Sequence, residues 1–278
     1  MIFECRARGI FRHDDGNSRS KLTPYVGDNV DITILDEEKL VAVIDAIHPR
    51  KNTLIRPPVV NVSQIAIVIS TANPSPNFLL VDKLIASAER ENVEILICVN
   101  KTDIKTSQEV VEIYETAGFP VISLCAANGQ NFAALSEQLN GKITVLAGNS
   151  GVGKSSILNI LMGETVMEVG EVSEKVQRGK HTTRHSELLL LPNNGYIIDT
   201  PGFSAFDSTE VEYEDVELYF REFEPYLGKC KFTGCSHIND KGCAILEAMD
   251  CGIISKGRHT SYVEMYTNAK KVKKWEKN

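Results

Sequence analysis

The first 62 residues carry short apolar and alternating runs that are typical of β-strands. These runs cover residues 2–12, 30–35 and 40–47, and turn-forming residues separate them. No amphipathic helix pattern stands out, and the pair Pro57-Pro58 ends the zone. Short strands with frequent turns predict a small all-β barrel or sandwich.

Residues 63–208 instead alternate apolar runs with amphipathic stretches. The predicted strands are Ile65–Ser70, Ile95–Val99, Val121–Leu124, Ile143–Ala147, Leu188–Leu191 and Tyr196–Ile198. The predicted helices are Phe78–Arg90, Ser107–Ala117, Phe132–Leu139 and Ser155–Met162. Strands that alternate with helices predict a parallel sheet with helices on both faces, which is an α/β domain.

Residues 209–278 become helical and gather cysteines. At roughly 150 residues per domain, a chain of this length should hold about two domains. The three different residue patterns predict three domains instead, at 1–62, 63–208 and 209–278.

Composition places the chain among globular proteins, because 42% of its residues are apolar and 24% are charged. Its longest apolar runs are about five residues, far below the ~20 that a membrane-spanning helix needs. The N-terminus lacks the basic start and apolar stretch of a secretory signal. We expect a cytoplasmic monomer with no membrane partner.

A phosphate-binding loop follows the strand that ends at Ala147 and opens the next helix. It fits the pattern G-x-x-x-x-G-K-[ST] with Gly148, Asn149, Ser150, Gly151, Val152, Gly153, Lys154 and Ser155, and Ser156 follows. Backbone N–H groups of such a loop cradle phosphates, and the helix N-terminus adds partial positive charge. Lys154 would reach the β- and γ-phosphates, and the Ser155 hydroxyl would hold Mg²⁺. The loop predicts a nucleoside triphosphate ligand.

A base-recognition motif ends the strand Ile95–Val99. It reads Asn100, Lys101, Thr102 and Asp103, which fits N-K-x-D. The Asp103 carboxylate can accept hydrogen bonds from N1 and the exocyclic amine of guanine, a donor pair that adenine lacks. Asp103 is therefore predicted to select GTP or GDP. Its presence argues against the alternative that the chain is an ATP-dependent enzyme.

A third nucleotide element follows the strand Tyr196–Ile198. Asp199 would hold Mg²⁺ through water, and the Gly202 N–H would contact the γ-phosphate. A polar loop before this strand offers two hydroxyls for Mg²⁺. We favour Thr183 and keep Thr182 open.

The order of these motifs is informative. The base motif at Asn100 precedes the phosphate loop at Gly148, whereas GTPases usually carry the phosphate loop first. The order predicts a circularly permuted GTPase whose nucleotide site is unchanged in space. The segment after Asp199 then leads directly into the C-terminal zone.

A metal site is predicted in that zone by Cys230, Cys235, His237 and Cys243. Three thiolates and one imidazole make a closed tetrahedral zinc site, which favours a structural role. Seven cysteines, an odd number, argue against a disulfide framework in a reducing compartment.

The net charge of the whole chain is −7, which by itself argues against a nucleic-acid partner. The charge is unevenly distributed, however, so the argument does not hold for every segment. Residues 63–208 carry 10 basic and 16 acidic side chains, whereas residues 225–278 carry 10 basic and 5 acidic ones. The basic C-terminal helix end is either a solvated tail or an RNA contact.

In combination, these motifs and their order resemble the small ribosomal subunit biogenesis GTPase A family over nearly the whole chain. The resemblance implies an N-terminal OB-fold, a permuted GTPase domain and a C-terminal helical zinc domain. It also implies binding to the small ribosomal subunit and its rRNA, with GTP hydrolysis stimulated by that subunit during late maturation.

Two positions depart from the family pattern. Members usually have one or two strands before the segment that matches Cys5 to Gly9, and this chain starts almost at that point, so the completeness of the barrel is left open. The family's Ser-Ala pair beside guanine is Cys125-Ala126 here, and the Ala126 N–H can still meet the guanine carbonyl oxygen.

No glutamine follows the Asp199-Thr200-Pro201-Gly202 motif, where many GTPases place one near the attacking water; Phe203 stands there. We predict slow intrinsic turnover and propose His181 as the residue that positions the water. The alternative is a loop histidine that contacts RNA or solvent. A GTP-regulated RNA-binding or translation-control module, in which hydrolysis only resets the switch, is the alternative function.

Overall fold

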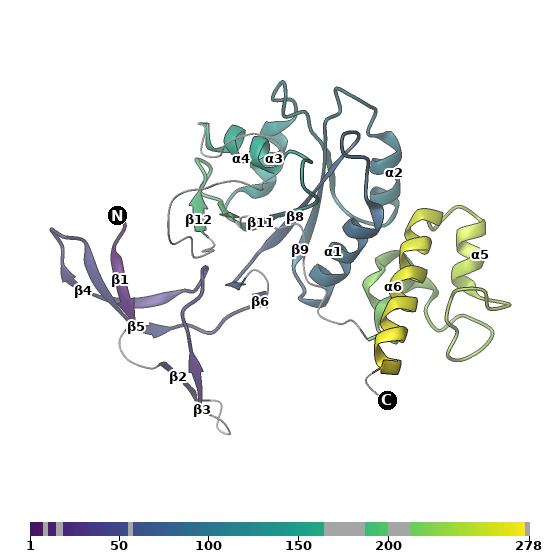
Figure 1. Cartoon of the computed structure of the whole chain (residues 1–278), viewed down its shortest axis with the longest axis horizontal. Helices are drawn as coiled ribbons and strands as arrows, with labels where there is room; N and C mark the ends of the chain where they lie inside the picture. Colours follow the sequence, from purple (N-terminus) through teal and green to yellow (C-terminus); the bar gives the residue numbers. More distant parts are fainter. Residues whose placement is uncertain (8–10, 15–18, 55–57, 164–186, 200–211, 276–278) are drawn as a thin grey trace.

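The computed structural model describes residues 1–7, 11–14, 19–54, 58–163, 187–199 and 212–275 (Figure 1). Three units follow one another along the chain. Figure 1 shows the N-terminal strands on the left, the central sheet with its helices in the middle, and the C-terminal helices on the right.

The N-terminal zone is built from strands, as predicted. They are β1 (Glu4–Ala7), β2 (Phe11–Asp14), β3 (Arg19–Leu22), β4 (Val30–Asp36), β5 (Val41–Ile47), β6 (Thr53–Leu54) and β7 (Val59–Val60). One sheet has the order β1-β5-β4, and β2-β3 and β6-β7 form two-stranded sheets. Among the described residues these sheets do not join into one closed barrel.

The central zone is a six-stranded sheet in the order β10-β9-β8-β11-β13-β12. Its strands are β8 (Gln64–Ser70), β9 (Glu94–Asn100), β10 (Val121–Ser123), β11 (Ile143–Ala147), β12 (Glu187–Leu190) and β13 (Tyr196–Asp199). Its helices are α1 (Phe78–Arg90), α2 (Gln108–Thr116), α3 (Phe132–Leu139) and α4 (Lys154–Met162). Every predicted strand and helix is present, and their bounds differ from the prediction by one residue at most.

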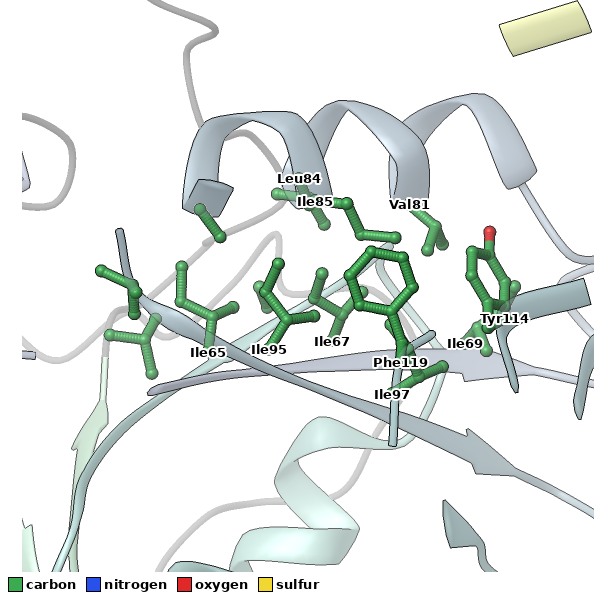
Figure 2. Close-up of a cluster of buried hydrophobic side chains, with 14 of the residues drawn as sticks. Ile65, Ile67, Ile69, Val81, Leu84, Ile85, Ile95, Ile97, Tyr114 and Phe119 are labelled. Carbon is green, nitrogen blue, oxygen red and sulfur yellow. The ribbon is translucent and has the colours of Figure 1, made fainter. Parts of the chain in front are cut away.

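Both faces of this sheet are buried. Figure 2 shows isoleucines from alternate positions of β8 beneath apolar residues of α1: Ile65, Ile67 and Ile69 beneath Val81, Leu84 and Ile85. The residues between them face the other side, where Ala66 and Val68 share a core with Leu135 of α3 and Ile157 of α4. Burial on both faces explains why this strand is a continuous apolar run.

One strand differs from the predicted parallel pairing. β12 runs antiparallel to β13, with Glu187 opposite Asp199 and Leu190 opposite Tyr196. A tight turn over residues 191–195 joins them, in which the Leu191 N–H donates to the Gly195 carbonyl at 2.8 Å. A connection this short permits a hairpin, because a parallel crossover needs about a dozen residues or more.

The C-terminal zone is helical, as predicted. It contains two 3₁₀ helices, η1 (Val216–Tyr219) and η2 (Arg221–Tyr226), and two α-helices, α5 (Ala244–Asp250) and α6 (Lys256–Trp275). Its core includes Phe220, Phe223, Ile245 and Tyr262, and Ala86 of α1 also belongs to it. The zone therefore packs against the helix that covers the central sheet (Figure 1).

A buried ion cluster lies at this junction. Arg258 of α6 donates to Asp82 of α1 at 2.6 Å, and to both oxygens of Glu222 of η2 at 2.7 and 3.1 Å. The side chains of Arg258 and Asp82 are each 1% exposed. Tyr114 of α2 also donates to Asp82, at 3.1 Å. Residues far apart in the sequence thus meet in one charged cluster.

No helix in the described part of the chain is long and apolar enough to span a bilayer. The domain limits 1–62, 63–208 and 209–278 stay predictions.

Candidate functional site

The phosphate loop lies between β11 and α4, as predicted. Gly148 has φ +138°, and a Cβ at this position would lie 2.2 Å from the Val68 carbonyl oxygen. Only glycine fits such a close approach between the loop and the neighbouring strand. The helix α4 begins at Lys154, so its first N–H groups face the loop.

Lys154 folds back over the loop. Its Nζ donates to the carbonyl oxygens of Gly148 and Asn149, each at 2.8 Å. Burial lowers the pKa of Lys154 to about 8. A bound phosphate would favour the charged amine, so phosphate binding and protonation of Lys154 are linked.

This linkage predicts a pH-dependent nucleotide affinity. Above about pH 8 Lys154 is neutral in the free protein, and phosphate binding must then take up a proton. We expect the Kd for GDP to be flat from about pH 6.5 to 7.5 and to rise about tenfold per pH unit above pH 8. Calorimetric titrations across this range measure it. Guanosine is the control for titration of the base itself, and a parallel rise for both ligands would contradict the prediction.

Asn100 connects the base motif to the phosphate loop. Its Nδ2 donates to the Val152 carbonyl at 2.9 Å, and its Oδ1 accepts from the Ala126 N–H at 3.1 Å. A Cβ at Gly153 would lie 2.3 Å from Nδ2, so glycine is required there. One buried side chain thus joins three predicted nucleotide segments that lie far apart in the sequence.

The rest of the base motif is arranged around this amide. Lys101 Nζ donates to the Gly151 carbonyl at 2.8 Å. Thr102 Oγ1 donates to the Leu124 carbonyl at 3.0 Å, which ties the motif to the end of β10. Asp103 is exposed, and it lies in the turn that follows β9. Its carboxylate is therefore open to a ligand.

Several predicted residues lie outside the described part of the chain. These are His181, Thr182, Thr183 and Gly202. Asp199 ends β13, the neighbour of β11 in the sheet, and only its backbone is described. Ser155 and Ser156 are half-buried in the first turn of α4. The roles assigned to all of these residues stay predictions.

The four predicted metal ligands are close together. Their ligand atoms all lie within 4.8 Å of one another. His237 Nδ1 lies 3.5 Å from Cys230 Sγ and 3.3 Å from Cys243 Sγ, and these two sulfurs are 3.9 Å apart. Tetrahedral zinc, with bonds of about 2.3 Å to sulfur and 2.0 Å to nitrogen, places its ligands roughly 3.5 to 3.8 Å apart. The cluster fits zinc.

Glu217 supports this cluster and was not identified from the sequence. Its Oε2 lies 2.8 Å from Nε2 of His237, the ring nitrogen that faces away from the sulfurs. A carboxylate in this position holds the Nε2–H tautomer and leaves Nδ1 free for a metal. Glu217 belongs to η1, and no spacing rule links it to a histidine 20 positions later.

Two family models and several named relatives match nearly the whole chain. Residues 47–209 match the family model described as RsgA GTPase, and residues 1–42 match the one described as RsgA N-terminal domain. A protein of Ruminiclostridium cellulolyticum named Small ribosomal subunit biogenesis GTPase RsgA is 45% identical over 98% of this chain and 88% of its own length. A relative of the same name from Agathobacter rectalis is 43% identical over 99% of this chain and 90% of its own length.

Two solved structures are similar as well. The crystal structure of YjeQ from Thermotoga maritima has a TM-score of 0.77 and 33% sequence identity, and the match covers 95% of this chain and 89% of that one. YloQ, described as a circularly permuted GTPase, has a TM-score of 0.76 and 32% identity over 97% of this chain and 86% of its own. The motif order of the present chain agrees with that description.

Proposed function

This chain belongs to the RsgA GTPase family, and on that premise we propose that it hydrolyses GTP in the biogenesis of the small ribosomal subunit. The observation that carries the proposal is the position of Asn100. Its side chain bridges a base motif that selects guanine and a loop that cradles phosphates. The relatives' shared name supplies the biological process.

In this proposal the nucleotide contacts the residues that the motifs predict. The base meets Asp103 and the Ala126 N–H, and the phosphates meet the loop from Gly148 to Ser156 together with Gly202. Ser155 and Thr183 hold Mg²⁺, with Thr182 as the alternative and Asp199 acting through water. Bound Mg²⁺ neutralises charge on the phosphates.

The C-terminal cluster holds one structural zinc ion in this proposal. Cys230, Cys235, His237 and Cys243 fill its coordination shell, and their spacing supports this. A closed shell has no position for a substrate, so the ion stabilises the zone and takes no part in hydrolysis.

The partner is the small ribosomal subunit, bound through its rRNA. The N-terminal strands and the basic end of α6 are the surfaces we propose for it. Lys270 and Lys271 are exposed on that helix. The proposal places the protein in the cytoplasm as a monomer that binds no membrane.

A comparison of GTPase rates with and without purified small subunits tests this function. We expect a stimulation well above tenfold, with large subunits as the matched control. Stimulation below that level, with GTP and RNA still bound, would favour the alternative of a GTP-regulated RNA-binding or translation-control module.

We further propose that His181 positions the attacking water. The substitution His181→Ala should then lower the subunit-stimulated rate at least tenfold without changing the Kd for GTP. Single-turnover hydrolysis on saturating subunits measures the rate, and a subunit-binding assay is the control. A wild-type rate would remove His181 from the catalytic role and leave it as a loop histidine.

The base assignment predicts a change of nucleotide preference in Asp103→Asn. An amide retains one acceptor but donates to the C2 carbonyl of xanthine, so the GTP-to-XTP affinity ratio should fall about 100-fold. Because Asp103 is exposed, the thermal midpoint should not change. Competition titrations measure the ratio, and an unchanged ratio would show that guanine is not read by Asp103.

A further inference from the structure

The segment between β8 and α1, residues 71–77, lies against the nucleotide site without belonging to any of its motifs. We call it the β8–α1 loop. Two of its residues contact the base motif directly. Thr71 Oγ1 donates to the Lys101 carbonyl at 2.6 Å, and Lys101 Nζ donates to the Asn73 carbonyl. Lys101 is thus held by this loop at both its backbone and its ammonium group.

The same ammonium group contacts the phosphate loop at Gly151. Lys101 therefore lies between two loops, and each supplies one carbonyl acceptor. The loops also approach each other directly: Pro74 Cδ is 3.6 Å from the position of a Cβ on Gly151, and a small cavity between them is lined by Ser75 and Asn149. The β8–α1 loop thus fixes Lys101 relative to the phosphate loop.

The β8–α1 loop is itself fixed at both ends. At its start, the Thr71 N–H donates to the Asn100 carbonyl at 3.0 Å, and Ser70 Oγ donates to the Pro74 carbonyl at 2.6 Å. At its end, Asn77 caps α1 by accepting from the Leu80 N–H at 3.1 Å. Ser70 and Thr71 are 1% and 3% exposed, so the contacts at the start of the loop are sheltered from water. A loop fixed in this way can hold Lys101 in place before any ligand arrives.

We propose that the β8–α1 loop is a positioning element of the guanine-nucleotide site, acting through Lys101. This rests on the proposed function only in taking the ligand to be a guanine nucleotide. Lys101 joins the base motif to the phosphate loop, and both GTP and GDP use these two parts of the site. The loop therefore sets how long either nucleotide stays bound and leaves the cleavage step unchanged.

The substitution Thr71→Val tests the proposal. Valine keeps the shape and removes the hydroxyl that holds the Lys101 carbonyl. We expect release of fluorescent GDP and of a non-hydrolysable GTP analogue to be five- to tenfold faster, with kcat at saturating GTP within twofold of wild type. Thr71→Ser should restore slow release. Thr116→Val makes the same change at an exposed position that ends α2, outside the loop; it is the matched control and should behave like wild type.

A double-mutant cycle separates positioning from general destabilisation. If Thr71 acts through Lys101, Thr71→Val should change release at most twofold in a Lys101→Met background. Wild-type release rates in Thr71→Val, or an unchanged five- to tenfold effect without Lys101, would overturn the proposal. If wild-type protein held ADP as long as GDP, the proposed guanine preference would fail instead, whatever the variants did.

Discussion

Removing zinc from the Cys230, Cys235, His237 and Cys243 cluster is expected to unfold the C-terminal zone. Structural zinc contributes on the order of 10 kcal/mol to folding, which is comparable to the whole stability of a typical domain. The zone's own core is small and partly completed by α1. Because Cys243 itself belongs to this core, loss of the ion also disturbs the apolar packing around it.

Limited proteolysis measures this outcome after treatment with a chelator. Cleavage should begin within residues 228–243 while the central sheet stays resistant, and added zinc should restore resistance. Cys243→Ser should behave like the chelated protein. Cys251→Ser is the matched control, because Cys251 is an exposed cysteine outside the cluster. A chelated protein with wild-type resistance would contradict a structural metal.

Glu217→Gln should weaken zinc binding, but less than the loss of a ligand in Cys243→Ser does. Loss of an outer carboxylate partner typically weakens metal affinity 10- to 100-fold without removing a ligand. Competition with a zinc indicator measures the affinity. Wild-type affinity in this variant would show that the contact with His237 does not tune the site.

The elements of the central sheet could be predicted from the sequence because each one is a local pattern. β8 is apolar at every position since both of its faces are covered, and α1 repeats apolar residues at helical spacing. The phosphate loop, the base motif and the metal cluster are also short motifs with a fixed chemistry. The direction of β12 was not predicted correctly, although only four residues, ending in Gly195, separate the two predicted strands and are too few for a parallel crossover.

The contacts that connect these motifs could not be predicted, because they depend on the tertiary fold. The carbonyl of Asn73 holds Lys101, and a backbone acceptor leaves no trace in residue type. Arg258 and Asp82 are 176 positions apart, and neither belongs to a motif. Sequence patterns predict which groups touch ligands, whereas the residues that hold those groups in place emerged only from the structure.

Arg258→Met is expected to destabilise the protein by about 3 to 5 kcal/mol. The substitution keeps an unbranched apolar side chain but leaves Asp82 and Glu222 buried beside each other without a positive partner. Phe220, whose ring centre lies 4.5 Å from the guanidinium carbon, also loses a cation contact. The lost stability should come from the contacts between α1 and α6. Urea unfolding at neutral pH measures the free energy.

The matched control is Arg221→Met, which removes an ion pair with Glu89 on the same helix α1. Arg221 is 40% exposed, so the cost should stay below about 1 kcal/mol. Similar losses in the two variants would contradict the argument that the buried charge decides the effect. Adding Asp82→Asn and Glu222→Gln to Arg258→Met should recover most of the loss, because no uncompensated charge then remains.

The pH dependence of the Arg258→Met variant tests the same cause. Burial already raises the pKa of Asp82, and Arg258 opposes that rise. Without Arg258 the folded-state pKa should rise further above the unfolded value, so the folded protein binds the extra proton. The deficit relative to wild type should therefore shrink as the pH falls from about 8 to about 5 and grow as it rises. A deficit that is constant with pH would point to lost packing rather than to stranded carboxylates at the junction of α1 and α6.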